Sequence, residues 1–283
     1  MTSPIQRVCV CGAGTMGAGI AQTLAAAGYA TLVYDLQKPG LQRAAQQIQQ
    51  QLDTAVAKGK MTSTDAGKIF QRIEFTDDLQ SCLADLFIEA IVERMEDKVA
   101  LFNQLAELNH SESIFASNTS SLSITGLANQ IQNPARVIGL HFFNPAHIMK
   151  LVEVIRTPQT DAGVAETAWT FIQSLGKTPV RCMDTPGFIV NRVARPYYIQ
   201  AMRSVEKGEA TPETVDRILE SAGFKLGPFK LTDLIGQDVN LAVSRSVYEQ
   251  LGEPERLKPS PLQEKLVQEG KWGRKTGEGF YRY

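Results

Sequence analysis

The first two thirds of the chain alternate short apolar runs with longer segments in which apolar residues recur every three or four positions. A short apolar run bounded by turn residues is typical of a buried strand, and the three-and-four spacing is typical of a helix. Their alternation predicts an α/β fold with a parallel sheet. We expect strands at residues 6–11, 31–34, 72–75, 86–90, 114–116, 137–141, 151–155 and 178–181. We expect helices at residues 16–27, 41–58, 99–108, 124–130 and 164–174.

The pattern changes at Asp184-Thr185-Pro186-Gly187, and beyond that point nearly every segment has helical spacing. Several helix starts there are marked by a proline that follows a residue suited to the N-cap. These starts are Thr211-Pro212, Gly227-Pro228 and Ser260-Pro261. We therefore expect two domains, residues 1–184 and residues 185–283, the second being smaller and all-helical.

Composition narrows the class of protein. Hydrophobic residues make up 43% of the chain and charged residues 21%, which is ordinary for a globular protein and argues against a disordered chain. The formal net charge of −1 provides no basic excess for nucleic acid, and no apolar run reaches the roughly 20 residues of a membrane span. Residues 1–4 lead into the first expected strand without the basic and apolar regions of a secretory signal.

The four cysteines are Cys9, Cys11, Cys82 and Cys182, and none belongs to a Cys-x-x-Cys pair or has a histidine near it in the sequence. Zinc sites and disulfide frameworks show such groupings. We therefore expect buried, reduced thiols, no bound metal and a cytoplasmic protein.

A phosphate-binding loop is indicated by Gly12, Gly14 and Gly17, which follow the first expected strand and open the first expected helix. Asp35 ends the next strand, close to the position of the acid that binds ribose in dinucleotide sites. The helix N-terminus offers N–H groups to the phosphates, and Asp35 would accept ribose hydroxyls and repel the 2′-phosphate of NADP. The pattern predicts a Rossmann-like NAD site. FAD uses the same fingerprint, and the alternative without a ligand is a glycine-rich turn beside a surface aspartate.

The candidate catalytic residues lie at the carboxyl ends of expected strands, where open α/β sheets bind ligands. His141 ends one such strand, and Glu153 interrupts the apolar run of another. A buried carboxylate needs a partner, and a histidine would satisfy it while being held in one tautomer. Residues 117–121 supply hydroxyl and amide groups at a further strand end, where one of them would also cap a helix. Taken alone, His141 could equally be a structural histidine.

Six stretches of the chain together match those of one enzyme family. They are GAGTMG at 12–17, ASNTSS at 116–121, HFFNP at 141–145, KLVE at 150–153, DTPGFIVNR at 184–192 and GRKTGEGFY at 273–281. On these stretches the chain resembles the NAD-dependent L-3-hydroxyacyl-CoA dehydrogenases, particularly the short-chain 3-hydroxybutyryl-CoA type. The resemblance implies a Rossmann-like first domain, a helical second domain and a homodimer formed through the second.

The resemblance also implies roles for individual residues. His141 would be the general base that takes the proton of the 3-hydroxyl while a hydride leaves C3 for NAD. Glu153 would orient and charge-stabilise His141. Ser120 would hold the substrate oxygen, and Asn191 would complete that oxygen site from the second domain.

The cofactor contacts implied by the resemblance fall into two groups, one in the glycine loop and one around the nicotinamide ribose. The first comprises Gly12, Ala13, Gly14, Thr15, Met16, Gly17 and Asp35, and the second Glu93, Lys98, Asn118, Ser120 and Asn144. The acyl-CoA substrate needs cations for its phosphates, for which Lys58 and Lys60 are the candidates. Related enzymes have a further lysine where this chain has Thr54, and the alternative for both lysines is simple solvation.

Three other hypotheses about the function are compatible with the sequence. A 3-hydroxyadipyl-CoA dehydrogenase would share every motif and differ by a basic pocket for the distal carboxylate. A dehydrogenase of free 3-hydroxy acids or sugar acids would use the same scaffold without a coenzyme A site. A non-catalytic NAD-binding or structural protein would have no use for the set formed by His141, Glu153, Ser120 and Asn191.

Overall fold

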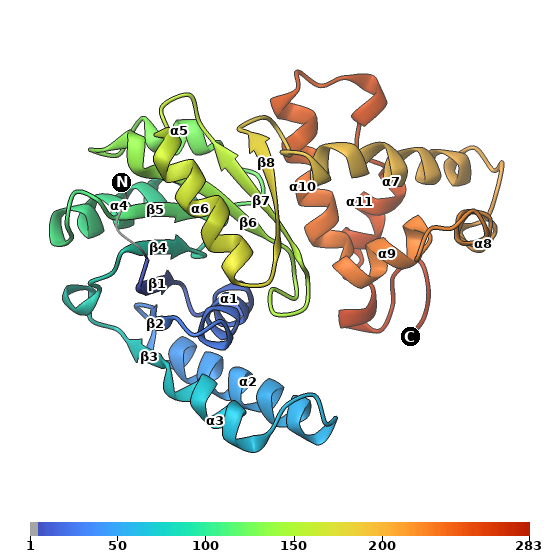
Figure 1. Ribbon diagram of the computed structural model, residues 1–283. Helices are drawn as coiled ribbons and strands as arrows, with labels where there is room; N and C mark the ends of the chain where they lie inside the picture. Colours follow the sequence, from blue (N-terminus) through green and yellow to red (C-terminus); the bar gives the residue numbers. More distant parts are fainter. Residues whose placement is uncertain (1–4) are drawn as a thin grey trace. The chain divides into compact units, whose positions relative to one another are not determined.

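The computed structural model describes residues 5–283, and the four residues before them, where the sequence predicts no signal peptide, lie outside the described part. The chain divides after Asp184 into two compact units, which we call the first unit and the second unit (Figure 1). The first is an α/β unit and the second is helical, as the sequence predicts.

The first unit is built on one eight-stranded sheet in the order β3-β2-β1-β4-β5-β6-β7-β8. The strands are β1 (Arg7–Cys11), β2 (Ala30–Tyr34), β3 (Ile73–Thr76), β4 (Leu86–Glu89), β5 (Ile114–Ser117), β6 (Val137–Phe142), β7 (Leu151–Arg156) and β8 (Thr178–Met183). The sheet is parallel from β3 to β6, as the sequence predicts, whereas β7 pairs with β6 antiparallel and β8 runs parallel to β7. Only residues 143–150 join β6 to β7, and a loop of that length returns the chain antiparallel, since a parallel pair needs a longer crossover.

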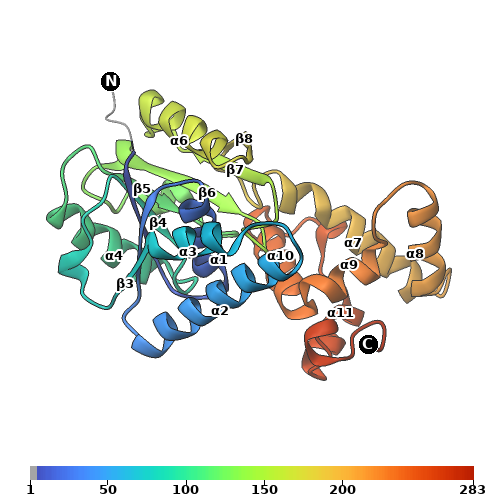
Figure 2. The ribbon, with the colours of Figure 1, turned by 60° about the horizontal axis from the view of Figure 1, so that its bottom comes forward.

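The helices of the first unit cover both faces of the sheet. They are α1 (Thr15–Ala26), α2 (Lys38–Ala57), α3 (Ser63–Gln71), α4 (Met95–Leu108), α5 (Ile124–Ala128) and α6 (Ala162–Ser174). One apolar core joins α1, α2, α3 and α6 to the strand residues that point to their side, such as Val8 and Val10. Side chains alternate along a strand, so Phe87 of β4 and Phe115 of β5 point to the opposite face. Their two rings stack, and the Phe115 ring also packs at a tilted angle against Phe102 of α4. Figure 2 shows α4 away from α1 and α2.

Two features of the helices differ from the sequence-based expectation. Helix α3 has no counterpart in the prediction, although Thr62 accepts a hydrogen bond from the Asp65 N–H in a capping motif that announces a helix start. Figure 1 shows α3 lying beside α2. Helix α4 begins at Met95, four residues before the predicted start, with Glu96 and Asp97 in the first turn where the helix dipole favours acids. That earlier start brings Lys98 into the helix.

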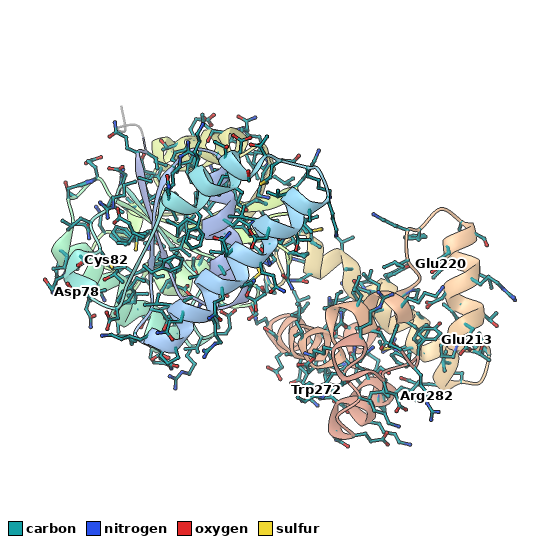
Figure 3. The ribbon with its side chains drawn as sticks, turned by 90° about the horizontal axis from the view of Figure 1, so that it is seen from below. Asp78, Cys82, Glu213, Glu220, Trp272 and Arg282 are labelled. Atoms are coloured by element: carbon teal, nitrogen blue, oxygen red, sulfur yellow. The ribbon has the colours of Figure 1, made fainter. Side chains whose placement is uncertain are left out.

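The second unit consists of α7 (Val190–Glu206), α8 (Pro212–Ser221), α9 (Pro228–Ile235), α10 (Gln237–Gln250) and α11 (Pro261–Gln268). Two buried aspartates secure it. Asp216 of α8 accepts the N–H groups of Phe229 and Lys230 and so caps α9, and it also accepts the Tyr281 hydroxyl. Asp233 accepts the Tyr281 N–H and ties down the segment after α11. Figure 3 labels Glu220 on α8, whose carboxylate pairs with Lys230 at 2.9 Å.

Within residues 5–283, none of the helices combines the length and the apolar character needed to cross a membrane.

Candidate functional site

The glycine loop joins β1 to α1 and leaves space where a phosphate would lie. Gly12 has φ +108°, and a Cβ there would come within 2.5 Å of the Ala90 carbonyl oxygen. A Cβ on Gly17 would come within 1.8 Å of the Gly12 oxygen, so both positions require glycine. A Cβ on Gly14 would meet nothing within 4 Å, which leaves open space in front of the helix. The loop therefore has the close backbone packing and the open face that a pyrophosphate needs.

The start of α1 and the end of β2 complete this part of the site. Helix α1 begins at Thr15 without a side-chain cap, so its first N–H groups remain available to an anion. Ala13 and Met16 lie in the same turn. The Asp35 carboxylate accepts the Ala13 N–H at 2.7 Å and the Gln37 N–H at 2.9 Å, which fixes it beside the loop. These residues fit NAD, since a fixed carboxylate accepts ribose hydroxyls and the helix N-terminus faces the phosphates.

The His141–Glu153 pair is a direct product of the strand arrangement. Because β6 and β7 are antiparallel, their register places these two residues opposite each other, where side chains on one face meet. His141 Nδ1 lies 2.7 Å from Glu153 Oε2, and the side chains are 5% and 1% exposed. A carboxylate only accepts hydrogen bonds, so Nδ1 carries the proton and Nε2 keeps a lone pair. The pair can therefore take up a proton at Nε2.

Ser120 lies on the other side of the imidazole. Its Oγ is 3.1 Å from His141 Nε2, and the ring of Phe143 lies 4.5 Å from the imidazole, centroid to centroid. The hydroxyl and Nε2 thus face the same point, where a substrate hydroxyl could bond to both. The structure brings together three of the four predicted catalytic residues in the first unit.

A buried ionic network supports the loop that carries Ser120. Lys98 Nζ lies 2.5 Å from Glu89 Oε1 and 3.1 Å from Glu93 Oε2. Glu93 Oε1 accepts the hydroxyls of Thr119 and Ser121. Burial acts to raise the pKa of Glu93, but the Lys98 charge and these hydrogen bonds outweigh it and lower the pKa. Glu93 and Lys98 are two of the five residues predicted near the nicotinamide ribose, and of these two Glu93 is the one that solvent reaches, with a side chain 41% exposed against 1% for Lys98.

Glu89 is a member of this network that the sequence analysis missed. It ends β4 and is fully buried, and burial raises its pKa against the opposing effects of Lys98 and Ser117. Glu89 stands at the end of an apolar run, and an acid in a strand that is expected to be buried is also the feature that identifies Glu153.

The remaining predicted cofactor residues lie around the end of β5 and β6. Asn118 Oδ1 accepts the Phe142 N–H at 2.8 Å, so this side chain joins the two strand ends. Asn144 is exposed in the loop that follows β6. Their predicted contacts with the nicotinamide ribose stay predictions.

The predicted coenzyme A lysines lie at the end of α2. The helix ends at Ala57, so Lys58 is its C-cap residue and not part of its last turn as the sequence predicts. Lys58, Lys60 and Thr54 are all exposed. Thr54 lies one turn before Lys58, whose N–H bonds to the Thr54 carbonyl oxygen.

Asn191 lies in the first turn of α7 in the second unit. The Nε of the buried Arg195 donates to the Asn191 carbonyl oxygen at 3.0 Å, and its Nη1 donates to Asn240 and Ser244 of α10. The role of Asn191 in an oxygen site stays a prediction.

Comparison with known proteins identifies the family. The family description "3-hydroxyacyl-CoA dehydrogenase, NAD binding domain" matches residues 7–185, and "3-hydroxyacyl-CoA dehydrogenase, C-terminal domain" matches residues 187–283. The chain belongs to the 3-hydroxyacyl-CoA dehydrogenase family. This confirms the resemblance given by the sequence motifs, and the NAD-binding description confirms the predicted cofactor.

The relatives cover nearly the whole of the chain. A 3-hydroxyadipyl-CoA dehydrogenase of Escherichia coli K12 is 50% identical over 279 residues, which are 98% of this chain but 59% of that protein. The mitochondrial hydroxyacyl-coenzyme A dehydrogenase of Sus scrofa is 42% identical over 99% of this chain and 91% of its own length. The crystal structure of (S)-3-hydroxybutyryl-CoA dehydrogenase from Ralstonia eutropha superposes with a TM-score of 0.93 at 36% identity, over 99% of both chains. The chain thus spans little more than half of the E. coli relative and nearly all of the other two.

Proposed function

We propose that this chain is an NAD-dependent dehydrogenase that interconverts (3S)-3-hydroxyacyl-CoA and 3-oxoacyl-CoA, with the short-chain 3-hydroxybutyryl-CoA as its substrate. The observation that supports it best is the orientation of His141. Its Nδ1 is held by the Glu153 carboxylate at 2.7 Å, and its Nε2 lies beside the Ser120 hydroxyl. A base fixed in this way, next to a donor for the substrate oxygen, suits an alcohol-to-ketone reaction.

In the oxidative direction, the substrate 3-hydroxyl lies between Nε2 of His141 and the hydroxyl of Ser120. His141 Nε2 takes the hydroxyl proton as the C3–H bond breaks, and NAD, when bound, supplies the acceptor for that hydride. The developing imidazolium is stabilised by the buried Glu153 charge. In the reverse direction His141 returns the proton to the oxygen while Ser120 donates to it.

The remaining predicted contacts belong to the same proposal. Asn191 would add a donor to the oxygen site. Lys58 and Lys60 would meet the coenzyme A phosphates, and their exposure at the end of α2 is compatible with that role. These contacts would bind the part of the substrate that does not react.

The test is NADH oxidation by the purified chain with acetoacetyl-CoA, beside free acetoacetate and 3-oxoadipyl-CoA. We expect kcat/KM with acetoacetyl-CoA to exceed that with free acetoacetate by at least about 100-fold, since remote binding energy is lost with the coenzyme A moiety. Comparable values for the two would identify a dehydrogenase of free acids. No turnover with any of the three would leave an NAD-binding protein without this activity.

A second candidate, 3-hydroxyadipyl-CoA dehydrogenase, is favoured by the name of the 50% identical E. coli relative. Such an enzyme needs a cation for the distal carboxylate. Arg195 is not that cation, because it is 3% exposed and its guanidinium already donates to Asn191, Asn240 and Ser244 within the second unit. The substrate comparison above therefore tests this candidate: a kcat/KM with 3-oxoadipyl-CoA at least about tenfold above that with acetoacetyl-CoA, a difference of about 1.4 kcal/mol, would support it. A lower value with 3-oxoadipyl-CoA would refute it.

We also propose a cytoplasmic homodimer formed through the second unit. That unit exposes large apolar side chains, which are costly to leave in water unless a second copy covers them. They are Ile189, Val193, Ile218, Phe224, Leu234, Ile235, Val239 and Trp272. Sedimentation that finds a monomer at micromolar concentration would refute the dimer.

A further inference from the structure

We propose that Glu89 is a positioning residue for the reaction: through both oxygens of its buried carboxylate it fixes the loop 117–121, and thereby holds the Ser120 hydroxyl against His141. The proposal rests on the proposed function, because it takes the roles of Ser120 and His141 from there.

The strand register explains why Glu89 can reach this loop. Glu89 is the last residue of β4 and lies opposite Cys11 of β1 and Ser117 of β5. It shares a sheet face with Phe87, whose ring stacks on Phe115 of β5. Its side chain is 0% exposed. A carboxylate at such a place is tolerated only if donors surround it, and both oxygens of Glu89 have them.

The first connection runs through Ser117. The Ser117 hydroxyl donates to Glu89 Oε2 at 2.6 Å, and the same hydroxyl oxygen accepts the Thr119 N–H at 3.3 Å. The Ser117 side chain thus ties the beginning of the loop to Oε2, and the main chain of Thr119 is tied to that side chain.

The second connection runs through two further charged groups. Oε1 of Glu89 accepts the Ile91 N–H at 2.8 Å and lies 2.5 Å from Lys98 Nζ. Lys98 Nζ also lies 3.1 Å from Glu93 Oε2, so a single ammonium group bridges the two carboxylates. Glu89 therefore determines where Lys98 lies and, through it, where Glu93 lies.

Glu93 in turn holds the far side of the loop. Its Oε1 accepts the Thr119 hydroxyl at 2.5 Å, the Ser121 hydroxyl at 2.9 Å and the Ser120 N–H at 3.3 Å. The main chain of Ser120 is therefore fixed by Glu93, while its hydroxyl contacts His141 Nε2 at 3.1 Å. Ser117 holds one side of the loop and Glu93 holds the other. Because the Glu89 carboxylate binds Ser117 directly and Glu93 through Lys98, it positions both sides.

The test is a double-mutant cycle between Glu89 and Ser120. Glu89→Gln keeps the shape but places an amide between Ser117, Lys98 and the Ile91 N–H, where only an acceptor satisfies all three donors. We expect kcat with acetoacetyl-CoA to fall about 10- to 100-fold, with KM for acetoacetyl-CoA within about threefold, because a transition-state contact is misplaced. In a Ser120→Ala background the same substitution should lower kcat less than about threefold, because the group that Glu89 positions is already gone.

Each outcome decides the proposal. An equal fall of kcat in both backgrounds, or no fall in the wild-type background, would show that Glu89 serves only to stabilise the fold. If Glu89→Gln fails to fold by circular dichroism, Ser117→Ala replaces it, with an expected fall of about three- to tenfold that disappears in the Ser120→Ala background; a fall that persists there overturns the proposal.

The matched control is Glu74→Gln, an exposed glutamate of β3 that pairs with Arg7 and lies far from the loop in the sheet order. It should leave kcat unchanged. If the wild-type chain does not turn over acetoacetyl-CoA, the proposed function fails and the positioning role fails with it. An active wild-type chain with equal losses in both backgrounds overturns the role of Glu89 alone.

Discussion

Glu153→Gln is the substitution that most sharply perturbs the catalytic pair. In the native pair Glu153 Oε2 lies 2.7 Å from His141 Nδ1, and both side chains are buried. The amide keeps nearly the same shape and can still accept from Nδ1 through its oxygen. What it removes is the negative charge beside the imidazolium that forms when His141 takes the substrate proton.

The magnitude follows from that geometry. Two unit charges with centres about 4 Å apart interact by about 4 kcal/mol at an effective dielectric constant near 20. Part of this is recovered by the remaining hydrogen bond, so we expect a loss of at least about 2.7 kcal/mol, or about 100-fold in kcat. That lies at the lower end of the roughly 10²- to 10⁴-fold range of general-base catalysis.

The assay is the steady-state formation of NADH from (3S)-3-hydroxybutyryl-CoA at one fixed pH, with NADH affinity measured separately. Glu166→Gln is the matched control, since Glu166 is an exposed acid that pairs with Arg181. His141→Gln should cost at least as much as Glu153→Gln, and the double variant less than the sum, because the two residues act as one unit. A Glu153→Gln enzyme that keeps kcat within about threefold of the wild type would refute the pair, because that is less than a general-base effect.

Three further predictions concern other parts of the first unit. Asp35 should enforce NAD over NADP by at least about 100-fold in kcat/KM, because a 2′-phosphate near its fixed carboxylate costs up to about 4 kcal/mol before screening; comparable efficiency with both cofactors would remove Asp35 from the ribose site. Lys58→Ala should raise KM for acetoacetyl-CoA and leave kcat nearly unchanged, since a contact far from C3 contributes equally to the ground state and the transition state. An unchanged KM would show that the end of α2 does not bind coenzyme A. Finally, the four free, buried cysteines should react with a thiol reagent at pH 8 only after unfolding. Burial raises the pKa of Cys182 to about 11, which leaves about one thiolate in a thousand at that pH, and fast labelling of the folded chain would contradict the buried packing.

The catalytic pair could be predicted because each residue breaks the pattern of its own strand. Glu153 is an acid inside an apolar run, and a buried carboxylate needs a hydrogen-bond partner. His141, at the end of another apolar run, is a side chain that can be that partner. The direction of β7 could not be read from its own residues, because an apolar run looks the same in parallel and antiparallel strands. The structure shows that this direction is what sets His141 opposite Glu153.

The network beneath the loop 117–121 was only partly predictable. Family resemblance assigns Glu93 and Lys98 to the ribose, whereas it assigns no role to Glu89, which stands at the end of a strand. Its partners lie on β5, on α4 and in the loop after β4, so their meeting depends on the sheet order and on the early start of α4. Helix α3 was missed for another reason, since its few apolar residues gave a weak pattern although the Thr62–Asp65 capping motif was present.

The most direct test of the central claim is the oxidation of (3S)-3-hydroxybutyryl-CoA by NAD, followed in the wild-type chain and in His141→Gln under single-turnover conditions. We predict rapid NADH formation by the wild type and a rate at least about 100-fold lower in the variant, with NADH affinity unchanged, because only the proton acceptor at Nε2 has been removed. A His141→Gln chain that forms NADH within about threefold of the wild-type rate, below the range of general-base catalysis, would contradict the assignment of His141 as the base.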